Sequence, residues 1–201
     1  NKPGELATAE IGELWKKGGA LWLISGIHGE EPAGPNALAQ NIHFLNKIAK
    51  DIPIVLLPLC NPFGYMRNWR YPNRKRTARS GEINSVGNSE HFLLVHPKSK
   101  RARIKNPTLP ESLAITSFAL HTTENYPPQL VLDFHEDESL RQTYIYSQGK
   151  LGTADPIAKK IALILRKHNS SLKISGKTRF GERIINGIVG NVHDSSIDEL
   201  L

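Results

Sequence analysis

Two short segments of the sequence carry the residue types of a catalytic zinc site. His28 and Glu31 are three residues apart, and His135 lies far downstream. Two imidazoles and one carboxylate leave a fourth position of the ion open for water, which distinguishes a catalytic zinc site from a closed structural one. Such an ion lowers the pKa of its bound water and polarises a carbonyl group. The three residues therefore predict hydrolysis of an amide or similar bond at one zinc ion.

Both halves of this constellation follow apolar runs that are typical of buried strands. Residues 20–27 form a nearly unbroken apolar run, which His28 and Glu31 follow. Residues 129–134 form a second such run, and His135 comes directly after it. In open α/β sheets, sites form outside the carboxyl ends of strands. We therefore expect the two segments to meet at one edge of a sheet.

Each segment alone has a plainer interpretation. A histidine after a strand is more often a loop or capping residue, and His-x-x-Glu recurs by chance. The combination of residue types with their placement after two strands favours the metal site.

The remaining patterns predict an α/β fold. A helix over residues 32–50, with Leu38, Ile42, Leu45 and Ile48 in the core, is followed by a buried strand over 53–59. A strand, a helix and a strand within this length imply a right-handed βαβ unit with parallel pairing. We expect a three-layer fold with a mostly parallel or mixed central sheet and helices on both faces.

Further elements are expected downstream. Leu113, Phe118 and Leu120 should supply the apolar contacts of a helix over residues 111–123, and a strand is expected over 142–147. Asp155 is a suitable N-cap for a helix over 155–168. The apolar face of that last helix is expected to comprise Ile157, Ile161, Leu163 and Leu165.

The connection over residues 60–109 is polar, basic and long, which is typical of a functional or mobile segment. Basic side chains gather over residues 67–79 and again over 98–105. The first stretch leaves a strand end and favours an anionic substrate, whereas the second is equally well explained as a solvated surface. Clustered cations also attract nucleic acid. However, few aromatic residues accompany them and no nucleic-acid motif is present, so we expect no nucleic-acid partner.

Length and composition predict a single domain over residues 1–201. No apolar run approaches the roughly 20 residues that cross a bilayer, and the first residues lack the apolar core of a signal peptide. The single cysteine, Cys60, excludes an internal disulfide and fits a reducing compartment. We expect it to be a buried or strand-end thiol rather than a ligand. These features predict a cytoplasmic protein without a membrane partner.

At this point the sequence resembles the zinc metallocarboxypeptidase family. The resemblance rests on His28-Gly29-Glu30-Glu31, on the Asn-Pro-Phe-Gly turn at 61–64 followed by Arg70, on His135, and on Ser-Ile-Asp at 196–198. The sequence around His28 is most similar to that of two branches of the family. These are the short bacterial murein-peptide amidases and the aspartoacylase/succinylglutamate desuccinylase branch.

The resemblance implies a carboxypeptidase-like fold and a role for each matched residue. His28, Glu31 and His135 would bind one zinc ion. Arg70 would bind substrate and stabilise the oxyanion of the transition state; its plainer interpretation is another surface arginine. Asn61 more simply shapes the turn through hydrogen bonds to nearby backbone.

Two departures bear on substrate specificity. The family's Asn-Arg pair, which grips a terminal carboxylate, has no arginine in the corresponding residues 84–92. Arg74, Arg76 or Arg79 could replace it. The tyrosine that closes over substrate in digestive members is absent before Ser196. Carboxypeptidase specificity is therefore not implied by the resemblance.

A third departure concerns the general base. The family's catalytic glutamate lies beyond the Ser-Ile-Asp segment, and this sequence stops at Leu201. We expect the natural chain to continue with a strand that carries it; otherwise Glu136, Asp137 or Glu30 must take the proton. In the plainer interpretation, Asp133 or Asp137 orients a ligand histidine and Glu30 is solvated.

The leading hypothesis is a zinc-dependent amide hydrolase of carboxypeptidase type. It would cleave a peptide with a free carboxylate, such as a cell-wall peptide. An N-acyl amino acid deacylase and a non-catalytic metal-binding relative are the alternatives, and a nucleic-acid-binding module is a weaker one.

Overall fold

The chain forms two compact units in the computed structural model. The first unit comprises Asn1–Glu136 with Leu200–Leu201, and the second comprises Asp137–Glu199. His28, Glu31, Arg70 and His135 all belong to the first unit. The structure describes residues 18–73, 75, 93–104, 106–136, 142–168, 171–190, 192–193 and 196–201.

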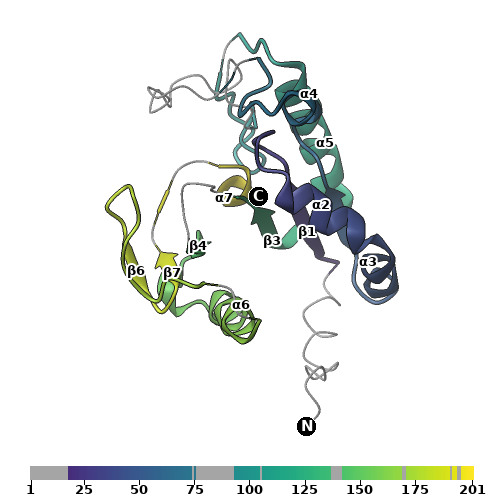
Figure 1. Cartoon of the computed structure of the whole chain (residues 1–201). Helices are drawn as coiled ribbons and strands as arrows, with labels where there is room; N and C mark the ends of the chain where they lie inside the picture. Colours follow the sequence, from purple (N-terminus) through teal and green to yellow (C-terminus); the bar gives the residue numbers. More distant parts are fainter. Residues whose placement is uncertain are drawn as a thin grey trace. The chain divides into compact units, whose positions relative to one another are not determined.

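A parallel three-stranded sheet forms the centre of the first unit (Figure 1). Its strands are β1 (Ala20–Ser25), β2 (Ile54–Leu57) and β3 (Pro128–Phe134), in the order β2-β1-β3. Both neighbours run parallel to β1. The predicted βαβ unit is confirmed, and the carboxyl ends of β1 and β3 lie side by side.

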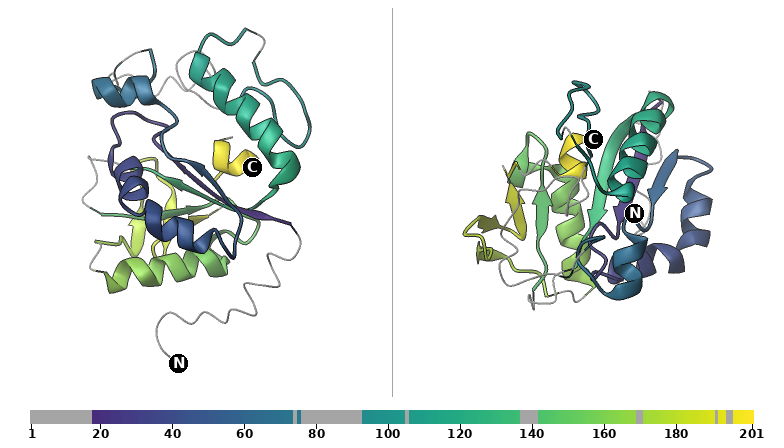
Figure 2. Two further views of the ribbon diagram at one scale, coloured as in Figure 1. Left: turned by 90° about the vertical axis from the view of Figure 1, so that its right-hand side faces the viewer. Right: turned by 90° about the horizontal axis from the view of Figure 1, so that it is seen from above.

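Helices cover both faces of this sheet (Figure 2). A Cβ atom built on Gly34, in helix α2 (Ala33–Gln40), would lie 3.1 Å from the Cβ atom of Ser25. On β1, Trp22 faces the opposite side and makes an edge contact with Phe118 of helix α5, with 6.3 Å between ring centroids. The α/β class with helices on both faces is therefore confirmed.

Strands β1 and β3 were both predicted to be buried on both faces, and they differ in this respect. Every residue of β1 except Leu21 is buried, as expected for a central strand. The residues of β3 are half-buried or exposed, and within the first unit β3 is an outer strand of the sheet. The prediction of a strand buried on both faces was thus right for β1 and wrong for β3.

The helix expected over residues 32–50 is divided at Asn41. It forms α2 and then α3 (Ile42–Ile48). The Asn41 side chain donates to the carbonyl of Ala37 at 2.9 Å, and such local bonds compete with helix continuation. Leu38 is buried, but α3 contains no buried residue. The predicted core role is therefore wrong for Ile42, which is exposed, while Leu45 and Ile48 are only half-buried.

The predicted contacts of helix α5 (Pro110–Asn125) are confirmed for Phe118, which touches Trp22, but the buried residues of this helix are others. Its buried residues are small or β-branched: Ser112, Ile115, Thr116 and Ala119. Leu113 is 51% exposed, which contradicts its predicted contact role. A prediction from hydrophobicity picks out the largest apolar side chains, whereas three of the four buried residues of this helix are small or polar.

The connection over residues 60–109 contains the short helix α4 (Pro62–Arg67). Asn61 is its N-cap, and an isolated bridge between Val95 and Ala102 follows further along. Cys60 is buried, as expected, and burial raises the pKa of its thiol well above the usual range.

The second unit contains a mixed four-stranded sheet in the order β4-β7-β6-β5. Strand β4 pairs in parallel with β7, while β6 pairs antiparallel with both β7 and β5. The 3-10 helix η1, helix α6 and the short helix α7 complete the order of elements. The bounds are β4 Ile145–Ser147, η1 Gly152–Ala154, α6 Pro156–Lys167, β5 Ser175–Lys177, β6 Arg183–Ile185, β7 Ile188–Gly190 and α7 Ile197–Leu200.

Asp155 caps α6, as predicted, because its side chain accepts from the backbone N–H groups of Ile157 and Ala158. The predicted apolar face is wrong in part: Ile157 and Leu163 are exposed. The core of the second unit instead uses Ala158 and Ala162 with Leu172 and Ile188, against which Ile145 and Leu165 pack.

None of the helices that the structure describes is both long and apolar enough to cross a bilayer.

Candidate metal centre

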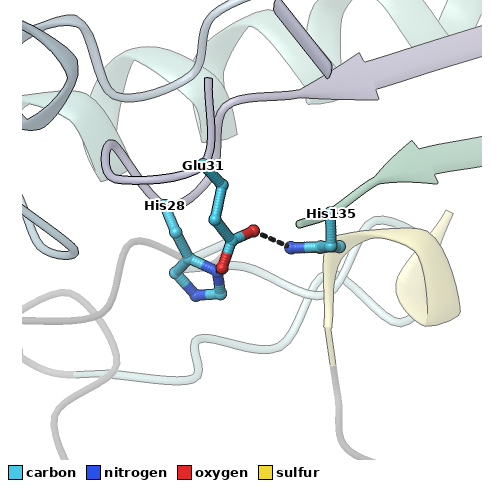
Figure 3. A group of neighbouring side chains, drawn as sticks. All are labelled: His28, Glu31 and His135. Carbon is cyan, nitrogen blue, oxygen red and sulfur yellow. Dashed lines mark hydrogen bonds and ion pairs between the residues drawn. The ribbon is translucent and has the colours of Figure 1, made fainter. Parts of the chain in front are cut away.

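His28, Glu31 and His135 converge at the carboxyl ends of β1 and β3 (Figure 3). One donor atom from each residue lies within 4.8 Å of the others. The Glu31 carboxylate lies between the two rings: its Oε1 is 2.9 Å from Nδ1 of His28, and its Oε2 is 2.9 Å from Nδ1 of His135. The structure thus brings together the three residues that the sequence singled out.

The first side of the site, the turn after β1, is fixed by close backbone packing. A Cβ atom on Gly29 would overlap the backbone of Gly64 and Tyr65, so only glycine allows this approach. The N–H of Gly29 donates to the carbonyl of Arg70 at 3.2 Å. His28 and Glu31 are 8% and 5% exposed, respectively. This packing leaves the two side chains little freedom to move.

The second side, the loop after β3, is held by polar contacts. The side chain of His135 is 43% exposed. Its Nε2 lies 2.9 Å from Oδ2 of Asp133, so the other ring nitrogen, Nδ1, faces Glu31. A carboxylate that orients a ligand histidine in this way is typical of metal sites. Of the two aspartates considered for this role, Asp133 makes the contact, and Asp137 lies outside the described residues.

Charges within the cluster shift the pKa values of Glu31 and His135 in opposite directions. Burial alone would raise the pKa of Glu31, but hydrogen bonds from His135 and His28 outweigh it and hold this pKa well below its usual range. Desolvation opposes charge on His135, yet the carboxylates of Asp133 and Glu31 raise its pKa well above the usual range. Both ring nitrogens of His135 face carboxylate oxygens, an arrangement that favours its charged form in the absence of metal.

Arg70 lies beside the cluster. Its Nη1 is 3.1 Å from Oε1 of Glu31 and 3.5 Å from Oε1 of Glu30. The plainer interpretation of Arg70 as a surface arginine does not fit, because its side chain is only 17% exposed. Glu30 was expected to be solvated, but its side chain is 16% exposed and pairs with Arg70.

Asn61 fixes the backbone at Arg70. Asn61 is fully buried. Its Oδ1 accepts from the N–H of Gly64 at 2.8 Å, and its Nδ2 donates to the carbonyl of Arg70 at 3.1 Å. Its own N–H donates to the carbonyl of Gly26 at 2.9 Å. Asn61 shapes the turn, as predicted, and also ties it to the end of β1.

The three arginines considered as replacements for the family's carboxylate-binding arginine lie outside the described part of the chain: Arg74, Arg76 and Arg79. Residues 84–92, which correspond to the family's Asn-Arg pair, also lie outside it. Arg67, in the same basic stretch, packs its guanidinium 3.8 Å from the ring centroid of Phe63. In the second unit, Ser196 donates to Asp198, and Ile197 is buried.

Sequence reasoning missed the contacts of Glu136. Its N–H donates to Oε2 of Glu31 at 3.1 Å, and its own Oε2 accepts from the N–H of Ala33 at 3.0 Å. One signal was present in the sequence: helix α2 begins after Pro32, which cannot supply a capping side chain. The helix therefore needed an acceptor from elsewhere.

Comparison with known proteins identifies the family. Residues 17–163 match the family described as the succinylglutamate desuccinylase/aspartoacylase catalytic domain. This match covers more than half of the sequence, and the chain belongs to that family. Because the family falls within the zinc carboxypeptidase-like hydrolases, the resemblance found in the sequence is confirmed. Among curated proteins, none matches the chain.

Solved structures from three Shewanella species are similar in fold. The proteins from Shewanella baltica and Shewanella amazonensis, each described as a "putative metallopeptidase", have TM-scores of 0.63 and 0.64 and are each 22% identical. Both alignments cover 90% of this chain and 62% of the other. The Shewanella denitrificans protein, described in the same words, has a TM-score of 0.59 and is 21% identical. Its alignment covers 90% of this chain and 59% of the other. This chain thus spans less than two thirds of the length of these proteins.

Proposed function

We propose that this chain forms the zinc site of an amide hydrolase whose substrate carries a free carboxylate. The observation that carries the proposal is the convergence of His28, Glu31 and His135, whose donor atoms lie within 4.8 Å of one another. The family to which the chain belongs supports a hydrolase of the zinc carboxypeptidase-like type.

The donor set fits zinc. Two imidazole nitrogens and one carboxylate are the ligands of catalytic zinc sites, whereas calcium and magnesium prefer oxygen alone. Cobalt is accepted by the same donors. The contact of Asp133 with His135 adds the outer carboxylate that commonly orients a ligand histidine. When bound, the ion would polarise a carbonyl and lower the pKa of water towards neutrality.

Separate residues of the chain would bind the ion, orient a ligand and stabilise the oxyanion. His28, Glu31 and His135 hold the ion, and Asp133 keeps the His135 ring in place. Arg70 offers a fixed cation where the carbonyl oxygen of a substrate gains negative charge. Its position is supported by Asn61 and Gly29, which both bind its carbonyl oxygen.

An N-acyl amino acid is the first substrate class that we propose. It has the amide bond and the free carboxylate that the site requires, and the family description names two enzymes of this kind. A net charge of +7 favours such anionic substrates over neutral ones.

A peptide with a free carboxylate, including a cell-wall peptide, is the second class. It is supported by the description of the three structural neighbours as putative metallopeptidases.

The test combines zinc content with hydrolysis by the full-length protein. A panel of acyl-aspartate, succinyl-glutamate and short peptides separates the two substrate classes. We expect Arg70→Gln to retain zinc and to lower kcat by about 10²–10³, the usual cost of one oxyanion donor. The exposed Arg101, changed in the same way, serves as the control.

Zinc binding without cleavage of any panel member would instead favour a non-catalytic relative. Cleavage that persists after complete removal of metal would refute the proposed function.

A further inference from the structure

Glu136 joins the two sides of the site through two different atoms. Its backbone N–H donates to Oε2 of Glu31 at 3.1 Å, while its side-chain Oε2 accepts from the N–H of Ala33 at 3.0 Å. More than a hundred residues of sequence separate Glu136 from both partners. The two bonds therefore tie the loop after β3 to the turn after β1.

The side-chain bond meets a need of helix α2. Its N-cap, Pro32, makes no side-chain capping bond, and its first turn contains no acidic residue. The first N–H groups of a helix have no partner within the helix and favour a negatively charged acceptor. The Glu136 carboxylate supplies this acceptor to Ala33, so the contact is stabilising in its own right.

The backbone bond of Glu136 connects two of the predicted metal ligands, Glu31 and His135. Oε2 of Glu31 receives the N–H of Glu136 and also lies 2.9 Å from Nδ1 of His135. His135 directly precedes Glu136, and consecutive Cα atoms are about 3.8 Å apart. Holding Glu136 against Glu31 and Ala33 therefore limits where the Cα atom of His135 can lie.

Burial alone does not hold His135. Its side chain is 43% exposed, in contrast to 7% for that of Glu31. The last residue of β3, Phe134, is also exposed. At this end of the sheet, polar contacts must replace the packing that fixes the turn after β1.

We propose that Glu136 is a positioning residue that clamps the loop of His135 onto the turn that carries His28 and Glu31. This role rests on the proposed function, because it presupposes that the three residues bind zinc. It assigns the Glu136 carboxylate to the first N–H of α2 rather than to a proton of the substrate.

The test measures zinc affinity by competition with a chromophoric chelator, together with unfolding of the metal-free protein in urea. Glu136→Ala removes the bond to Ala33 but keeps the backbone bond to Glu31, so it should weaken zinc binding by about tenfold, the lower end of the usual loss for groups that position a ligand. Glu136→Gln should stay close to the parent, because its amide oxygen can still accept from Ala33. Glu124→Ala, which removes an exposed glutamate from α5, should leave zinc affinity unchanged.

Cobalt loading adds a spectroscopic measure of geometry. We expect the visible bands of the Glu136→Ala protein to differ from those of the parent, and those of Glu136→Gln to match them.

Three results would overturn the positioning role. Glu136→Ala could bind zinc as tightly as Glu124→Ala, even if its unfolding midpoint falls, or Glu136→Gln could lose as much affinity as Glu136→Ala. A parent protein that binds no zinc would overturn the proposed function and this role together. In the first two cases the parent still binds zinc, so the failures are distinguishable.

Discussion

The two sides of the metal centre are fixed by different forces. In the turn after β1, Gly29 packs directly against the backbone of α4, and both ligand side chains are buried. In the loop after β3, a partly exposed His135 is held by Asp133 and Glu31. Packing tolerates almost no change of shape, whereas polar contacts depend on charge and pH. Substitutions in the turn after β1 should therefore lower the stability of the fold. Substitutions in the loop after β3 should instead lower the affinity for zinc, to a degree that depends on pH.

Removing the residue that bridges both sides should have the largest effect. Glu31→Ala removes the carboxylate that contacts His28, His135 and Arg70. It would leave two imidazoles beside a guanidinium, so we expect zinc content to fall to background. Elemental mass spectrometry of the purified protein measures it. Retention of one zinc per chain would show that Glu31 is not a ligand.

Breaking the packing of the first side should come next. A methyl group on Gly29 overlaps the backbone of Gly64 and Tyr65, and overpacking of this kind costs about 1–3 kcal/mol. We expect Gly29→Ala to lower the free energy of unfolding by that amount and to weaken zinc binding. Urea unfolding measures it. As a control, Gly149→Ala places its Cβ in ordinary contact, 3.6 Å from Asp155, and should be nearly neutral. Equal stability of the two variants would contradict the packing account.

Weakening the second side should cost affinity rather than the fold. Asp133→Asn removes the charge that orients His135, and we expect zinc affinity to fall by about 10–100-fold. The measurement belongs at a pH above the raised pKa of His135, where protons no longer compete with the metal. A loss confined to stability, with zinc affinity intact, would exclude the orienting role.

The stability of the metal-free protein should depend on pH in opposite directions through His135 and Glu31. Because the pKa of His135 is raised in the folded protein, its charge stabilises the metal-free protein fully below about pH 6.5. This stability is lost as the pH rises through the raised value. Glu31 has a lowered pKa, so its contribution is fully present above about pH 4.3 and is lost as the pH falls further, through the lowered pKa of the folded protein.

Zinc affinity should follow the opposite trend to the stability that His135 provides. The His135 ring must lose a proton to bind metal, so affinity should rise about tenfold per pH unit up to the raised pKa. Chelator competition across this range measures the slope, and Asp133→Asn should flatten it because the pKa of His135 falls. An affinity independent of pH would contradict the charged state of His135.

The sequence predicted the position of the site better than the faces of the helices. Two apolar runs ending in His28 and His135 were enough to place both residues at one sheet edge, because parallel strands present their carboxyl ends together. Helical periodicity suggested that Ile42 is a core residue and that Leu113 supplies apolar contacts, but both are exposed. Spacing shows that a helix has an apolar stripe but does not show which neighbours cover it.

Contacts between distant segments were harder to predict. The bonds of Glu136 to Ala33 and to Glu31 depend on the approach of two loops that lie more than a hundred residues apart in the sequence. The helix and strand propensities of a segment depend on its local sequence and therefore do not predict which distant segment approaches it. Gly29 and Gly64 gave a partial signal, since glycine marks positions where another backbone comes close.

Metal content of the parent protein and of His135→Ala tests the central claim most directly. His121→Ala, which changes an exposed histidine of α5, is the matched control. If the two sides form one centre, the parent and the control should each contain one zinc per chain, and His135→Ala should contain none. A full complement of zinc in His135→Ala would show that the loop after β3 is not part of a metal site.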